Sequence, residues 1–112
     1  DIITYGMKNI STVTEDGSTG LKGNVIHLLE KNIDKLKSSK IKIFSCGPIG
    51  MLKALKEFAI KYEFECEAST ECAMACGFGI CQGCPIESTH RPDKYHLVCK
   101  DGPVFNVRDV VL

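Results

Sequence analysis

The sequence contains no tryptophan, only eight other aromatic rings and no excess charge of either sign. Fourteen acidic and fourteen basic side chains give a formal net charge of zero, so a broad basic face for nucleic acid or anionic membrane is not expected. No apolar run approaches the roughly 18 residues of a membrane-spanning helix, and the N-terminus has no basic-then-apolar signal pattern. These absences predict a cytoplasmic globular protein with no membrane and no nucleic-acid partner.

Seven cysteines are present, an odd number, and most of them cluster in the second half of the chain. A secreted disulfide scaffold usually carries an even set that is spread along the sequence. Short spacers between cysteines favour metal ligation in a reducing compartment. With 112 residues, the chain has room for one domain, or for two small ones that share a core.

The strongest motif is a cysteine quartet. Three members have the spacing C-x4-C-x2-C, and the fourth lies further along the chain: Cys76, Cys81, Cys84 and Cys99. This is the ligand pattern of plant-type [2Fe–2S] proteins. Three glycines between these thiols would permit the positive φ angles with which backbone N–H groups can point at sulfur: Gly77, Gly79 and Gly83. The quartet therefore predicts an iron–sulfur cluster.

A four-thiolate zinc site is the main alternative reading of the quartet. Such sites usually bring two C-x2-C pairs, and only Cys81 and Cys84 form one here. Cys72, four residues before Cys76, could be an alternative ligand, but the complete quartet favours a spare thiol. Cys66 alternates with apolar neighbours and is expected to pack in a sheet.

The pattern along the chain changes near Ser69. Strands are expected at residues 10–14, 41–45 and 64–68, with helices from Asn24 to about residue 37 and from Pro48 to about residue 62. This order predicts an α/β fold: part of a doubly wound parallel sheet with crossover helices, preceded by residues 1–6 as the tail of another element. Residues 70–112 are expected to form a small loop-rich [2Fe–2S] domain, in which residues 86–92 are turn-like and short strands occupy residues 95–99 and 104–107. The predicted domains are therefore residues 1–69 and 70–112.

Two strand ends are candidate dinucleotide contacts. Cys46, Gly47 and Pro48 lie between a strand and a helix start, where an open parallel sheet binds ligands, although a simple turn cap fits equally well. Glu15 and Asp16 follow the first strand and could accept ribose hydroxyls, but a solvated turn is the commoner explanation. The three histidines are expected to be surface or structural residues, and no GxGxxG motif is present.

Several segments resemble a known family. Residues 44–54, which include Cys46-Gly47-Pro48, resemble the C-terminal signature of the NAD(P)-binding domain of ferredoxin–NADP⁺ reductase-like proteins, and residues 14–18 with Lys22-Gly23 resemble its preceding segment. Residues 74–84 and 98–105 are similar to one branch of that group, the electron transfer subunit of class 1B dihydroorotate dehydrogenase. The resemblance covers nearly all of the chain.

The resemblance implies a route for electrons in pyrimidine biosynthesis. NADH would reduce FAD in the subunit, and a [2Fe–2S] cluster would pass electrons to an FMN-containing catalytic partner in a hetero-oligomer, where dihydroorotate is oxidised. The resemblance also implies that the quartet ligates the cluster, that Cys46, Gly47 and Pro48 form the nicotinamide-side loop, and that Glu15 and Asp16 contact the dinucleotide.

The sequence departs from the family because it lacks the FAD-binding β-barrel and the glycine-rich phosphate loop. It is therefore expected to be a C-terminal fragment of an oxidoreductase subunit that binds FAD and NADH poorly and is not catalytic alone. Two other readings stay open: a related subunit of a sulfide dehydrogenase or bifurcating transhydrogenase, and a zinc-stabilised interaction module.

Overall fold

The computed structural model describes residues 9–112, so the expectation for residues 1–6 lies outside the described part. The chain divides into two compact units, residues 1–38 and 39–112, which are described separately. Within residues 9–112, no helix has both the length and the apolar character required to cross a membrane.

The first unit contains two very short strands and two short helices. β1 (Val13–Thr14) pairs in parallel with β2 (Leu21–Lys22), so the predicted strand at residues 10–14 is shorter than expected and has a partner that the sequence pattern did not indicate. α1 (Val25–Lys31) begins after Asn24, whose side chain accepts the His27 N–H at 3.0 Å and confirms the predicted N-cap.

The single helix predicted for the first unit is broken at Asn32. α2 (Ile33–Lys37) follows as a separate short helix. The Asn32 amide donates to the Leu28 carbonyl at 2.8 Å, and its backbone (φ −104°, ψ 14°) leaves the helical range. Asparagine side chains compete in this way for helical backbone groups, which is why the apolar periodicity alone did not reveal the break.

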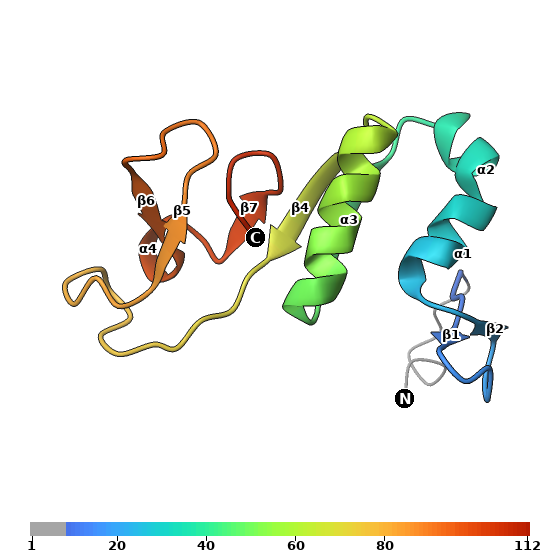
Figure 1. Cartoon of the computed structure of the whole chain (residues 1–112), viewed down its shortest axis with the longest axis horizontal. Helices are drawn as coiled ribbons and strands as arrows, with labels where there is room; N and C mark the ends of the chain where they lie inside the picture. Colours follow the sequence, from blue (N-terminus) through green and yellow to red (C-terminus); the bar gives the residue numbers. More distant parts are fainter. Residues whose placement is uncertain (1–8) are drawn as a thin grey trace. The chain divides into compact units, whose positions relative to one another are not determined.

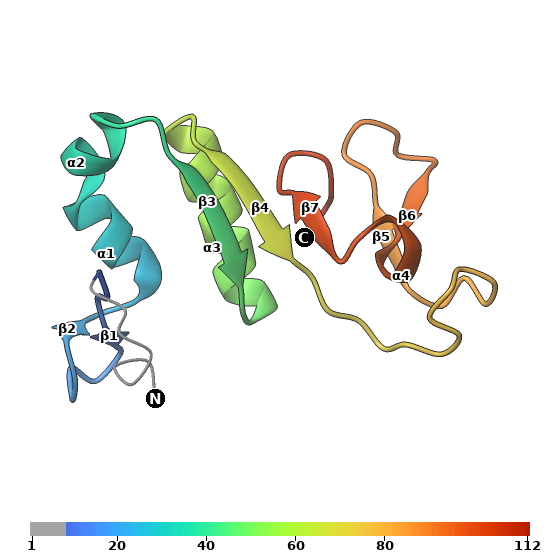
Figure 2. The ribbon, with the colours of Figure 1, turned by 180° about the vertical axis from the view of Figure 1, so that it is seen from behind.

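The second unit is built on a strand–helix–strand crossover. β3 (Lys42–Cys46) and β4 (Glu65–Ser69) pair in parallel, and α3 (Ile49–Lys61) connects them and covers one face of the pair (Figures 1 and 2). This confirms a mixed α/β fold and both predicted strands to within a residue. The crossover follows the usual rule that parallel strands need a long connection.

The third strand of this sheet was not expected there. β7 (Val104–Asn106), from the cysteine-rich half of the sequence, pairs antiparallel with β4, so the order is β3-β4-β7. The sheet is therefore mixed rather than wholly parallel. It combines strands from both sides of the predicted domain boundary at Ser69. That boundary stays a prediction, as does the reading of the sheet as half of a doubly wound domain.

One face of α3 supplies the core beside the sheet. Leu52, Leu55, Phe58 and Ala59 recur at helical spacing and are almost fully buried. The Phe58 ring stacks on Phe64 with centroids 5.8 Å apart. In β4, Cys66 and Ala68 are also buried, so Cys66 packs in the sheet as predicted.

The cysteine-rich region has a small hairpin of its own. β5 (Pro85–Glu87) pairs antiparallel with β6 (Tyr95–Leu97), and α4 (Val98–Asp101) follows at once. The strand predicted at residues 95–99 therefore ends at Leu97, because the Asp101 carboxylate accepts the Leu97 N–H at 2.7 Å and fixes a helical turn that carries Cys99. The short β5 was wrongly included in a turn-like stretch.

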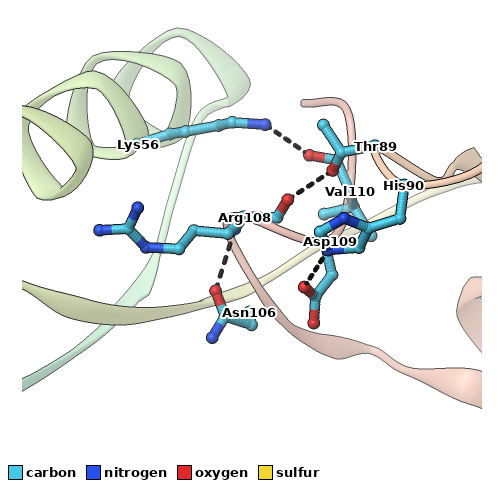
Figure 3. Close-up of polar contacts among 7 residues, drawn as sticks. All are labelled: Lys56, Thr89, His90, Asn106, Arg108, Asp109 and Val110. Carbon is cyan, nitrogen blue, oxygen red and sulfur yellow. Dashed lines mark hydrogen bonds and ion pairs between the residues drawn. The ribbon is translucent and has the colours of Figure 1, made fainter.

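The C-terminal segment, residues 103–112, joins these parts. Lys56 of α3 donates to the Val110 carbonyl at 2.7 Å, and the Arg108 guanidinium reaches the Ala59 carbonyl at 3.3 Å. On its other side, the segment binds the chain after β5, where His90 pairs with Asp109 at 2.9 Å (Figure 3). The cysteine-rich region is thus held against α3 and β4 by this segment.

Candidate metal centre

Cys76 and Cys81 form one end of the candidate centre, and both lie on a tightly curled loop. Residues 70–84 contain no helix or strand, and positive φ angles at Gly77 (73°) and Gly79 (90°) turn the backbone as the sequence predicts. Gly83 was also expected to have a positive φ, but Gln82 takes that conformation instead (58°). The Gly83 N–H still points at sulfur, with its nitrogen 3.4 Å from Cys81 Sγ.

Backbone N–H groups converge on the Cys76 sulfur. The Cys81 nitrogen lies 3.4 Å from Cys76 Sγ, and the Phe78 and Ile80 amides also donate to it. These donors, the Cys81 amide above all, lower the pKa of the Cys76 thiol to about 6. Because a thiolate is the form that ligates iron, this end of the loop is prepared for a metal.

The other end of the centre is formed by Cys84 and Cys99. Their sulfurs lie 3.2 Å apart, and Cys84 is only 4% exposed because it belongs to a small core with Leu97 and Val98. The pKa of Cys84 is lowered, first by the Cys99 backbone N–H, whereas the pKa of Cys99 is raised, first by the side chain of Cys84. One thiol of this pair is thus favoured as a thiolate in the cluster-free protein.

The donor set fits a two-iron group. A [2Fe–2S] cluster with four thiolates carries two on each iron, and the structure supplies two pairs: Cys76 with Cys81, and Cys84 with Cys99. The N–H groups around Cys76 and Cys81 suit electron-rich sulfur. Within the described residues, no three Cys, His, Asp or Glu side chains surround one point as ligands of a single ion would.

The predicted nicotinamide-side loop lies beside the cysteine-rich region. Gly47 and Pro48 line an open cavity of about 600 Å³ together with residues from the other side, namely Cys72, Pro85 and Val98. The φ of Gly47 is 151°, a backbone conformation that residues with a Cβ rarely adopt, so this turn favours glycine. Cys46 is exposed and lines a separate hollow of about 280 Å³ with Phe44 and Val104.

Glu15 and Asp16 lie in the first unit, in an exposed turn. Asp16 accepts the Ser18 N–H at 2.9 Å, and this hydrogen bond lowers the pKa of its carboxyl group. The geometry is that of an ordinary Asx turn. A role for these two residues in dinucleotide binding stays a prediction.

The side chains around the cysteine loop point outward. Phe78 is 67% exposed and Ile80 is 74% exposed, and Met74 nearby is also exposed.

The histidines have structural contacts, as the sequence indicated: His27 completes the capping box of α1, His90 pairs with Asp109, and His96 packs on Phe105.

Sequence reasoning missed two features of the site. It did not place Cys72 next to Cys84, whose thiol it contacts, and it did not foresee that the C-terminal segment fixes the region to α3. The first could not be inferred because residues 70–84 have no periodic pattern. The second depends on hydrogen bonds to main-chain carbonyls, which carry no residue-type signal.

Comparison with known proteins agrees with this geometry. Residues 71–111 match the family model described as the iron–sulfur cluster binding domain of dihydroorotate dehydrogenase B. A solved structure of an NADH-dependent reduced ferredoxin–NADP oxidoreductase, studied for flavin-based electron bifurcation, is similar with a TM-score of 0.71 and 28% identity. That similarity covers 86% of this chain and 33% of the other.

Curated relatives extend the similarity to most of the sequence. The dihydroorotate dehydrogenase B (NAD⁺) electron transfer subunit of Caldanaerobacter subterraneus subsp. tengcongensis is 41% identical over 109 residues, which cover 95% of this chain and 42% of the relative. The subunit of Streptococcus pneumoniae serotype 4 is 35% identical over 112 residues, which cover all of this chain and 42% of the relative. The chain thus spans less than half the length of these relatives. Residues 71–111 are thus similar to the iron–sulfur cluster binding domain of dihydroorotate dehydrogenase B, and nearly the whole chain is similar to part of the electron transfer subunits of that enzyme.

Proposed function

We propose that the chain relays single electrons through a [2Fe–2S] cluster ligated by Cys76, Cys81, Cys84 and Cys99, as part of a dihydroorotate dehydrogenase B electron transfer subunit. The observation that carries the proposal is the arrangement of these thiols in two pairs, one of them surrounded by backbone N–H donors. The matched family model and the similar subunits support the same role.

The cluster, when bound, would accept one electron from a two-electron flavin and pass it on. The chain's own residues provide the surroundings for this step. N–H groups of Phe78, Ile80 and Cys81 stabilise negative charge on sulfur, while the burial of Cys84 keeps water from one side. Both effects would set the potential of the bound cluster.

The rest of the route is carried over from the family. NADH would reduce FAD in the complete subunit, and electrons would leave the cluster for an FMN-containing catalytic subunit that oxidises dihydroorotate. The cavity supports this order, since Gly47 and Pro48 on one side face Pro85 and Val98, the neighbours of two proposed ligands, on the other. In this proposal, Cys46, Gly47 and Pro48 form the nicotinamide-side loop.

The surface for the catalytic subunit would be the apolar rim of the cysteine loop. Phe78 and Ile80 are the two most exposed apolar residues next to the proposed ligands, on a loop between Cys76 and Cys81. Apolar side chains that gather around a functional loop mark an interface better than scattered ones do.

A second candidate function is that of the corresponding subunit of a bifurcating transhydrogenase. The similar structure of a bifurcating oxidoreductase favours it. In this second candidate function, the cluster is the same and the redox partner is different. The higher identity of the dihydroorotate dehydrogenase B subunits, 41% against 28%, favours the first proposal.

Two measurements test the proposal. Protein purified without air is expected to contain about two irons and two sulfides per chain, with a visible spectrum that dithionite bleaches. One tightly bound zinc and no iron after reconstitution would contradict the cluster. The full-length subunit should then reduce the catalytic subunit of dihydroorotate dehydrogenase with NADH; reduction of only a transhydrogenase partner would favour the second candidate.

A further inference from the structure

The site contains one more thiol than a four-thiolate cluster uses. Cys72 lies four residues before Cys76, in the stretch without helix or strand, and is exposed. Its neighbours in the 600 Å³ cavity include Pro85 and Val98, which adjoin Cys84 and Cys99 in sequence. Cys72 therefore lies beside one particular end of the centre.

Contacts between the thiols confirm which end this is. The Cys72 side chain hydrogen-bonds the Cys84 thiol, and Cys84 Sγ lies 3.2 Å from Cys99 Sγ. Cys72 and Cys99 thus both contact Cys84, so Cys72 lies at this end of the centre. At the other end, Cys81 donates its N–H to Cys76, whereas the Cys72 side chain interacts with Cys84.

We propose that Cys72 is a reserve ligand for the iron that Cys84 and Cys99 would hold. The inference rests on the proposed cluster. When either ligand is lost, the Cys72 thiol releases its proton to solvent and its sulfur forms the replacement bond to iron. The exchange restores four thiolates and transfers no electron. Because residues 70–84 have no regular structure, Cys72 can move toward iron without breaking a strand or a helix.

The test compares cluster assembly in variants of the full chain after anaerobic reconstitution with iron and sulfide. Cys99→Ala should keep most of its iron and sulfide, with shifted visible circular dichroism and shifted EPR g-values of the reduced cluster. Adding Cys72→Ala should lower the cluster content at least about tenfold, a typical scale for loss of metal-site support. Cys72→Ala alone should keep the native spectrum, because the ordinary quartet is intact.

The matched control uses the other end of the centre. Cys81→Ala should lose the cluster to the same extent with and without Cys72→Ala, because the Cys72 side chain interacts with Cys84, at the opposite end of the centre. Far-ultraviolet circular dichroism of the cluster-free variants checks that each one folds alike.

Several results would overturn the proposal. The first is an equal cluster content in Cys99→Ala and in the double variant Cys99→Ala/Cys72→Ala, whether that content is high or zero. The second is loss of the cluster in Cys72→Ala alone. A wild-type chain that binds no iron would instead refute the proposed function, so the two failures are distinguishable.

Discussion

At the scale of single residues, Cys76 and Gly79 show how backbone geometry prepares this site. Three amide groups converge on the Cys76 sulfur, and they can do so because the chain turns through positive φ angles at Gly77 and Gly79. The lowered pKa of the Cys76 thiol therefore depends on the loop conformation, and a change in that conformation should change this pKa.

The reactivity of Cys76 should reveal this arrangement in the cluster-free protein. The pKa of its thiol is about 6, so it is mostly thiolate at neutral pH. Burial raises the pKa of Cys66, which serves as an internal control. Iodoacetamide should alkylate Cys76 much faster than Cys66 at pH 7, and the Cys76 rate should fall as pH drops through about 6. Peptide mass spectrometry measures both rates; equal labelling of the two would contradict the loop geometry.

Gly79 should be intolerant of a side chain. Its φ of 90° disfavours any Cβ, and the added atom would lie 3.3 Å from the Lys100 side chain. Gly79→Ala is expected to cost about 1–2 kcal/mol of unfolding free energy. Gly50 lies in α3 with open space around it, so Gly50→Ala should instead stabilise by about 0.5–1 kcal/mol. Urea unfolding compares the two variants, and a neutral Gly79→Ala would argue against the curled loop.

At the scale of elements, α3 is the support on which the second unit is organised. It connects the parallel strands, covers one face of the sheet and offers Lys56 to the C-terminal segment (Figure 3). Its buried residues recur at helical spacing, so the sequence predicted this helix and its apolar face directly.

Leu55 lies at the centre of the buried face of α3 and is 3% exposed. Leu55→Ala should lower the free energy of unfolding by about 2–5 kcal/mol, because it removes buried methyl groups and leaves a cavity. The exposed Lys53 on the same helix is the control, and Lys53→Ala should change stability by less than about 0.5 kcal/mol. Chemical denaturation measures both; similar losses would mean that α3 is not packed as described.

At the scale of the whole molecule, the C-terminal segment and the exposed cysteine loop have complementary roles. The segment binds α3 and β4 on one side and the chain after β5 on the other. The loop, by contrast, leaves Phe78 and Ile80 in solvent. One feature fixes the centre to the α/β unit, and the other leaves it accessible to a partner.

Lys56→Met should loosen the C-terminal segment. The substitution keeps an apolar stem but removes the donor 2.7 Å from the Val110 carbonyl. Leaving that carbonyl unpaired should cost about 1–3 kcal/mol. Hydrogen exchange should then speed up at Val107 and Val111, whose N–H groups bind Cys66 and Glu87. Lys53→Met, on the exposed face, should not alter exchange there; unchanged protection in Lys56→Met would contradict the role of this contact.

Phe78→Ala in the full-length subunit should slow electron transfer to the catalytic partner. It should leave the cluster content unchanged, because Phe78 contributes its backbone N–H and not its ring to the Cys76 sulfur. Stopped-flow reduction of the partner by NADH measures the effect, and Ile60→Ala, an exposed apolar change near the end of α3, is the control. Loss of the cluster in Phe78→Ala would show instead that the ring shields it.

The sequence by itself determined the local features of this protein. Apolar periodicity located α3, β3 and β4 to within a residue, because burial imposes a period on residue type. The spacing of Cys76, Cys81 and Cys84 predicted the metal centre, because ligands on one short loop are close whatever the rest of the chain does. Matches to known iron–sulfur domains agree with that prediction.

Only the tertiary structure decided the contacts between distant segments. It paired β7 with β4, brought Cys99 to 3.2 Å from Cys84, and placed Cys72 at the same end of the centre. Each of these outcomes depends on hydrogen bonds or sulfur contacts between residues that share no periodic pattern. Their physical cause lies in the packing of the whole unit rather than in local propensity.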